Sequence, residues 1–139
     1  MKTITVETTV RASIEHVWAC WTKPADIMVW NAASDDWACP AATNDLRIGG
    51  TFAFRMEAKD KSAGFDFGGT YTEIVPMARI AYTMDGEDTR KVEVSFIPTE
   101  GGVTVTETFE MENENPEEMQ RAGWQAILER FRRHAESAH

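Results

Sequence analysis

The sequence has no long apolar run and few basic residues, and both absences exclude classes of function. No stretch approaches the roughly 18 apolar residues that a membrane span needs, and the opening MKTITVETTV lacks the apolar core of a signal peptide. Lys and Arg number 14 against 23 Asp and Glu, which gives a formal net charge of −9. Nucleic acids and anionic membranes bind basic surfaces. We therefore expect neither a nucleic-acid partner nor membrane insertion, and we expect a cytoplasmic protein.

Residues that bind metals or catalyse reactions are also scarce. The two cysteines, Cys20 and Cys39, lie in apolar contexts without metal-like spacing and are expected to be reduced and buried. The three histidines, His16, His134 and His139, are scattered along the chain. No zinc, calcium or phosphate-binding motif is present, and no nucleophile elbow. We expect no metal site and no cofactor, and we expect His16 to face solvent.

The longest regular pattern is the stretch from Pro116 to Ala135, which predicts a helix. Apolar residues recur there at three- and four-residue spacing and form one stripe, while Gln120 falls on the opposite, polar face. The stripe consists of Met119, Gly123, Trp124, Ile127, Leu128, Phe131 and Ala135. The 139 residues suit one domain with a single core. A stripe this broad needs a large apolar surface to cover.

The residues before this helix predict strands and two short helices. Alternation predicts a first strand from Thr3 to Val10, and the short helices follow, from Ser13 to about Thr22 and from Pro24 to Trp30. Trp30 to Cys39 is expected to be a loop. Further strands are expected at Thr51–Lys59, Phe65–Val75, Arg79–Asp85, Lys91–Ile97 and Val103–Glu112, after a strand end and glycine turn at Asp45–Gly50.

Consecutive strands joined by short polar turns predict an antiparallel meander with one apolar face. The last helix is the element able to cover that face. Gly68 and Gly69 are expected to produce a bulge or a bend within their strand. The predicted fold class is α+β, a curved sheet that grips one long helix.

Glu107 is the polar residue that most needs an explanation. It shares the parity of Val105 and Phe109, so an unbroken strand points its carboxylate into the gripped interior. A carboxylate buried there needs a partner or takes up a proton. Glu107 is therefore a candidate polar anchor or acid/base. A bulge that turns it outward, or an ion pair near the sheet edge, is the structural alternative.

Aromatic and methionine side chains are expected to meet inside the sheet, as a filled core or as the lining of a ligand cavity. Gly123 favours a cavity or a close backbone approach, because glycine within a helix costs about 1 kcal/mol relative to alanine. The expected ligand-binding residues are Trp30, Trp37, Phe52, Phe54, Met56, Tyr82, Met84, Phe96, Glu107, Phe109, Gly123, Trp124, Ile127 and Leu128. Trp30 and Trp37 are expected near the mouth of this cavity.

Several blocks of the sequence resemble one family. They are V-x-A-S-x-E-x-V-W at 10–18, Trp30, D-L-R-I-G-G at 45–50, G-T-Y-x-E-I-x-P at 69–76, and Gly123-Trp124. Together they resemble the homologues of the activator of heat-shock-protein-90 ATPase, in the START-like (SRPBCC) superfamily, over nearly the whole chain from Thr3 to Phe131. The resemblance implies the helix-grip fold: a seven-stranded antiparallel sheet wrapped around the C-terminal helix, with two small helices at one end.

The resemblance also implies classes of function. Members of the superfamily bind lipids, sterols, polyketides and other apolar molecules between sheet and helix, and some catalyse cyclisation or hydrolysis there. Our first hypothesis is binding of a small apolar or amphipathic ligand. The second is a cyclase or hydratase that uses Glu107 as acid/base, although no catalytic motif transfers to this chain.

The third hypothesis is an interaction module for a chaperone or another regulatory protein. The chaperone activators carry a further docking domain for which this chain has no room, so chaperone activation is not expected. A monomer and a homodimer both remain open.

Overall fold

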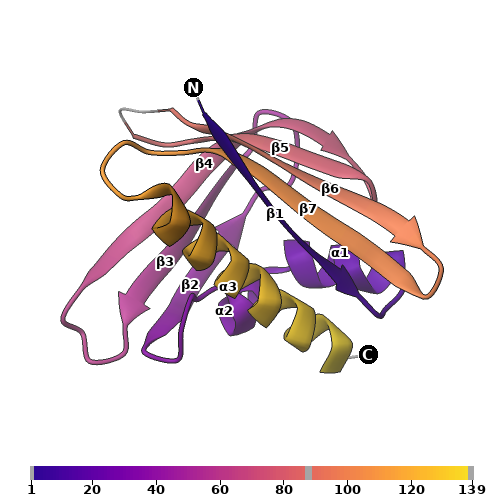
Figure 1. Cartoon of the computed structure of the whole chain (residues 1–139), viewed down its shortest axis with the longest axis horizontal. Coiled ribbons are helices and arrows are strands. Elements are labelled where there is room, and N and C mark those ends of the chain that lie inside the picture. Colours follow the sequence, from indigo (N-terminus) through magenta and orange to yellow (C-terminus); the bar gives the residue numbers. More distant parts are fainter. Residues whose placement is uncertain (1, 87–88, 138–139) are drawn as a thin grey trace.

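The structure is a computed structural model that describes residues 2–86 and 89–137 of the chain. In these residues the chain forms a seven-stranded sheet, two short helices and one long helix (Figure 1). The elements are β1 (Thr3–Val10), α1 (Ile14–Thr22), α2 (Pro24–Trp30), β2 (Trp37–Asn44), β3 (Thr51–Ala58), β4 (Gly64–Val75), β5 (Arg79–Met84), β6 (Lys91–Thr99), β7 (Gly102–Glu110) and α3 (Glu117–Ser137). His139 lies outside the described residues, as do the two central residues of the turn expected at Gly86 to Thr89.

The sheet is antiparallel throughout and its strands follow the order β1-β7-β6-β5-β4-β3-β2. Strands β2 to β7 form the predicted meander, each paired with the next in sequence. β1 joins the far edge by pairing with β7, where Thr3 lies opposite Glu110 and Val10 opposite Val103. The α+β helix-grip fold predicted from the sequence is confirmed.

The long helix α3 crosses in front of the curved sheet and packs against β1, α1 and α2 (Figure 1). Its C-terminal half carries the deepest contacts: Leu128, Phe131 and Ala135 are 0% exposed. The Phe131 ring meets Trp21 and Trp30 edge-on, with ring centroids 4.8 and 5.0 Å apart. Such aromatic pairs add to the hydrophobic burial of the rings. This end of the helix is firmly anchored.

The N-terminal turns of α3 differ from the predicted stripe. Met119 is 60% exposed, whereas Gln120, expected on the polar face, is buried. The Gln120 amide explains this exchange, because its Oε1 accepts a hydrogen bond from Glu112 N (3.0 Å) and its Nε2 donates to Glu112 O (3.1 Å) and Asn115 O (2.8 Å). At this position a buried amide that forms hydrogen bonds with the backbone before the helix stabilises the fold more than an apolar side chain would.

The stretch from Trp30 to Cys39 is not wholly a loop, because β2 begins at Trp37. The sequence of β2 gives little indication of a strand, because it is poor in β-branched residues. It also contains Pro40, which has no N–H to donate to a strand neighbour. β2 is an edge strand, and its pairing with β3 shifts between Ala38 and Ala41. Edge strands and bulges tolerate proline, which is why this segment can pair at all.

The segment from Asp45 to Gly50 is a turn that follows β2 rather than a strand end. Gly49 has a φ of 84°, as the paired glycines predict. Gly49 N donates to Tyr71 O and Tyr71 N donates to Gly50 O, both at 2.9 Å, so the turn is fastened to β4. The irregularity expected at Gly68 and Gly69 occurs further along β4 instead, between Tyr71 and Glu73.

His16 does not face solvent as expected. Its side chain is half-buried, and its Nε2 lies 2.8 Å from Ala135 O and 3.5 Å from Cys20 Sγ. His16 therefore connects α1 to the C-terminal end of α3. Among the described residues, no helix combines the length and the apolar character that crossing a membrane requires.

Leu128 and Met119 lie on one helix and differ in burial, at 0% and 60% exposure, which makes them a matched pair. We predict that Leu128→Ala lowers the free energy of unfolding by about 2–5 kcal/mol, because it removes buried methyl groups and leaves a void. Met119→Ala should change it by less than about 0.5 kcal/mol. Urea denaturation followed by circular dichroism measures both variants. Equal losses would contradict a helix held mainly through its C-terminal half.

Candidate functional site

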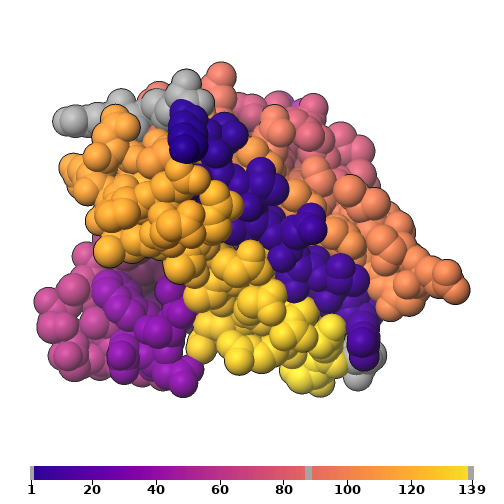
Figure 2. Space-filling model, in the orientation of Figure 1, coloured from indigo at the N-terminus to yellow at the C-terminus, as the bar shows by residue number. Residues whose placement is uncertain are grey.

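A cavity of about 390 Å³ lies between the N-terminal half of α3 and the inner face of the sheet. Small-molecule sites commonly measure about 300–1,000 Å³. In Figure 2 a hollow opens between the orange segment that follows β7 and the purple and magenta strands β2 and β3. The aromatic rings in its wall are those of Trp21, Trp30, Phe52, Phe54, Phe65, Phe67, Tyr71, Tyr82 and Trp124. A cavity with this lining suits a flat apolar molecule.

Most of the side chains expected to surround a cavity do lie in its wall. They are Trp30, Phe52, Phe54, Met56, Tyr82, Met84, Glu107, Gly123, Trp124 and Ile127. Strand alternation brings the members from β3, β5 and β7 together, and helical spacing brings those from α3. The sheet and the helix thus converge on one space.

Four expected residues, Trp37, Phe96, Phe109 and Leu128, do not line the cavity. In three of the four, the ring contacts the ring of a residue that does line the cavity. Phe109 is covered by Trp124, whose ring stacks on it at 4.0 Å. The ring of Trp21 meets Phe96 edge-on at 5.8 Å, and the ring of Phe65 lies 5.9 Å from Trp37.

Leu128 is enclosed in the core and reaches no free space, since its exposure is 0%. Its position in the stripe places it toward the core, but Ile127 is the neighbour that lines the cavity. Alternation and helical spacing fix the face on which a side chain lies, and not its depth below that face.

Trp30 lines the inner end of the cavity and not its mouth. It is only 5% exposed, and its Nε1 donates a hydrogen bond to Cys20 O at 2.9 Å. The exposed large apolar residues of the wall are Phe65 (52%) and Met119 (60%). These two, near the start of β4 and in the first turn of α3, lie at the mouth.

Sequence analysis missed several lining residues, of which the strand β4 supplies the most. Phe65, Phe67 and Tyr71 share one parity in β4, so the alternation that identified the inner faces of β3 and β5 would have found them. Trp21, at the end of α1, is another lining residue that was not expected. No local signal indicates that α1 reaches the cavity, because tertiary packing alone brings it there.

Phe52 is the centre of the aromatic wall. Its ring centroid lies 4.9 Å from those of Phe54 and Tyr82, and 5.3 Å from that of Tyr71. Gly69 makes this arrangement possible, because a Cβ there would lie 3.0 Å from the Phe52 ring and 2.6 Å from Thr83 O. The glycine in β4 therefore allows one ring to lie across the neighbouring strand.

Gly123 faces open space. A Cβ built on it would have no heavy atom within 4 Å apart from its own helix and chain neighbours. Of the two explanations considered for this glycine, room in the cavity fits and close backbone approach does not. The N-terminal half of α3 is accordingly a wall with free volume behind it.

Glu107 points into the interior from an unbroken stretch of β7, opposite Val6 on one side and Val94 on the other. It is 5% exposed and lies in the cavity wall. Burial raises the pKa of its carboxyl group to about 8, and within the described residues no cation or hydrogen bond counteracts this shift. The outward bulge and the edge ion pair are both excluded. At neutral pH the group is mainly protonated and can donate a hydrogen bond.

Two tyrosines add hydroxyl groups to the same wall. The Tyr71 hydroxyl donates to Asn44 Oδ1 at 2.6 Å, and Asn44 Nδ2 donates to Thr22 O at 2.8 Å, so this group has a structural partner. Burial raises the pKa of the Tyr82 hydroxyl well above its ordinary value, and the charge of Glu107 raises it further. Glu107 and Tyr82 are therefore neutral donors that face one cavity.

The fold and the cavity define a START-like, helix-grip protein. A sequence profile for the family described as Activator of Hsp90 ATPase homolog 1-like protein matches residues 11–136. The chain belongs to that family.

Solved structures of similar proteins agree with this assignment. The AHSA1-like protein from Aeromonas hydrophila is 44% identical over 99% of this chain and 94% of its own, with a TM-score of 0.92. A protein from Cytophaga hutchinsonii is 48% identical over 97% and 92% of the two chains, with a TM-score of 0.83. The Aha1 dimer from Colwellia psychrerythraea is 18% identical, covers 98% and 97%, and shares the fold at a TM-score of 0.73. No curated protein matches the chain.

Glu107→Gln tests the buried acid, because it removes the titrating group and keeps its shape. The folded protein retains the proton up to about pH 8, whereas the unfolded chain loses it near pH 4.3. Folding takes up a proton between these values, so the free energy of unfolding falls as pH rises through them. We predict that the free energy of unfolding of the wild type falls by several kcal/mol relative to that of Glu107→Gln between about pH 5 and 8. The slope should be about 1.4 kcal/mol per pH unit. Urea denaturation across this range measures it; a pH-independent difference would contradict the buried acid.

Gly123→Ala separates free space from close packing on the inner face of α3. We predict that it raises the free energy of unfolding by about 0.5–1 kcal/mol, since alanine favours the helix and the new methyl group meets no atom. Thermal and urea denaturation give the value. Ala122→Gly, at the exposed neighbouring position, is the control and should lower stability by a similar amount. Destabilisation by Gly123→Ala would indicate a closely packed site.

Proposed function

We propose that the protein binds a small hydrophobic or amphipathic molecule in the cavity between α3 and the sheet. The observation that carries this proposal is Glu107, a carboxyl group enclosed in an aromatic cavity without a hydrogen bond to a described residue. Burying a polar group without a partner costs stability. A bound molecule that accepts its hydrogen bond removes this cost.

The chemistry of the cavity indicates what the molecule must offer. Its body must be apolar and flat, to lie among the rings around Phe52 and Trp124. It must also carry an acceptor oxygen, such as a carbonyl group, because protonated Glu107 and the neutral Tyr82 hydroxyl are donors.

The naphthyl ketone prodan has both properties, and its emission shifts to the blue in an apolar site. We predict that it binds the wild type at pH 7 and that Gly123→Leu, which fills the cavity, abolishes binding while leaving the circular dichroism spectrum unchanged. Glu107→Leu should weaken binding by about three- to tenfold, and Glu107→Gln, which still donates a hydrogen bond, should preserve most of it. Above about pH 8 the wild type should lose affinity and Glu107→Gln should not. Binding unaffected by Gly123→Leu would place the ligand elsewhere.

An enzyme that uses Glu107 as general acid or base is the second candidate. A pKa of about 8 supports it, because proton transfer is most effective when the pKa lies near the working pH. Chemical change of a bound molecule, lost in Glu107→Gln while binding persists, would distinguish catalysis from binding alone.

A further inference from the structure

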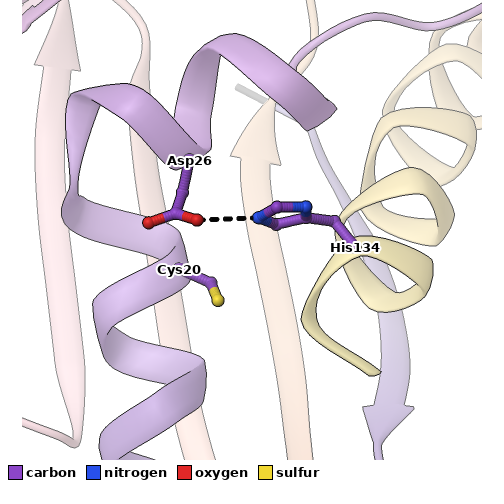
Figure 3. A group of neighbouring side chains, drawn as sticks. All are labelled: Cys20, Asp26 and His134. Carbon is purple, nitrogen blue, oxygen red and sulfur yellow. Dashed lines mark hydrogen bonds and ion pairs between the residues drawn. The ribbon is translucent and has the colours of Figure 1, made fainter. Parts of the chain in front are cut away.

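A group of possible metal ligands lies at the opposite end of α3 from the mouth of the cavity. Cys20 of α1, Asp26 of α2 and His134 of α3 point toward one another (Figure 3). Their ligand atoms, Sγ, a carboxylate oxygen and a ring nitrogen, all lie within 4.8 Å of one another. His134 Nε2 is 2.8 Å from Asp26 Oδ1. These residues have no metal-like spacing in the sequence, and only the fold brings them together.

The elements that carry these side chains are fixed in place. A single residue, Lys23, separates α1 from α2, and its N–H donates to Ala19 O at 3.0 Å. Trp30 Nε1 donates to Cys20 O at 2.9 Å, which ties the end of α2 back to α1. The contacts of Phe131 with Trp21 and Trp30 then place α3 against both helices. Metal sites on rigid elements need little rearrangement to bind.

We propose that Cys20, Asp26 and His134 bind a divalent transition-metal ion of borderline softness, for which Zn²⁺ is the model. Thiolate, carboxylate and imidazole are the three side-chain types that zinc takes as ligands. With zinc bond lengths of about 2.0–2.3 Å, neighbouring tetrahedral ligand atoms lie roughly 3.3–3.6 Å apart. Small side-chain rotations would bring the ligand atoms of Cys20, Asp26 and His134 from within 4.8 Å of one another into that arrangement. One thiolate and one carboxylate also neutralise the double charge of the ion, which makes its partial burial tolerable.

His16 lies beside this group, and a movement of its side chain would supply a fourth ligand. Its Nε2 lies 3.5 Å from Cys20 Sγ, the separation of neighbouring ligand atoms in a tetrahedral zinc site. The same nitrogen contacts Ala135 O at 2.8 Å, so coordination would exchange this contact for the metal. A site with Cys20, Asp26, His134 and His16 would connect all three helices.

An open groove gives access to this group. His134 also lines an open groove with Asp35, Arg130 and Arg133, through which an ion can approach. Arg130 is engaged by Asp35 at 2.7 Å. A bound ion would replace the proton of the Cys20 thiol, whose pKa is raised by burial.

Cobalt tests the site directly, because a Co²⁺–thiolate bond gives a charge-transfer band in the near ultraviolet. We expect chelator-treated wild type and Cys39→Ala, which alters the other buried cysteine, to develop this band with Co²⁺ and to lose it with Zn²⁺. Cys20→Ser should not develop it. His134→Gln and Asp26→Asn should weaken binding by at least about tenfold, since outer-shell partners alone are worth that much.

Two measurements on the wild-type protein guard against variants that fail to fold. Zn²⁺ should raise its melting temperature, and it should slow alkylation of Cys20 by iodoacetamide relative to Cys39, as mapped by mass spectrometry. Absence of the thiolate band, or a zinc effect that persists in Cys20→Ser, would overturn the proposal. Prodan binding is independent of these readouts, so the metal site and the cavity can fail separately.

Discussion

The apolar packing of α3 is deepest at its C-terminal end, and this asymmetry is the constraint on which the cavity depends. Phe131 packs among Trp21 and Trp30, and Leu128 and Ala135 are fully enclosed. Toward its N-terminus the packing is less complete: Gly123, five residues before Leu128, faces free space, and the Gln120 side chain holds the preceding loop. The sheet therefore grips the helix completely at its C-terminal end and leaves a hollow beneath its N-terminal end. A uniformly packed helix would leave no cavity.

The hollow contains features that do not serve stability. A glycine within a helix and a carboxyl group without a described partner each cost free energy of folding. Natural proteins concentrate such departures from the best local choice at functional sites. Here the two departures, Gly123 and Glu107, come from α3 and β7 and line the same space. Their coincidence supports a binding role more strongly than either residue does alone.

The sequence predicted the fold because its periodicities were strong and its turns were short. It also predicted the direction of Glu107, since an unbroken alternation in β7 leaves one orientation for it. How deeply each side chain lies below the inner face could not be predicted. Phe109 and Trp124 both face the interior, but Trp124 stacks on Phe109, and only Trp124 reaches the cavity. β2 was partly missed because Pro40 and its alanines carry little strand signal. The meeting of Cys20 and His134 has no local cause, since six strands of the sheet lie between α1 and α3 in the sequence.

The pairing of β1 with β7 has a consequence for how the protein folds. Thr3 pairs with Glu110, and β7 is the only strand that β1 pairs with in the described sheet, so the first strand has no partner until the last one is in place. α3 follows all seven strands in sequence, and it covers the inner face of the sheet. During synthesis that apolar face stays exposed until the final helix emerges from the ribosome. Contacts between distant segments also make folding slow. The same order of elements that builds the cavity therefore leaves apolar surface exposed in the unfinished chain, which favours aggregation.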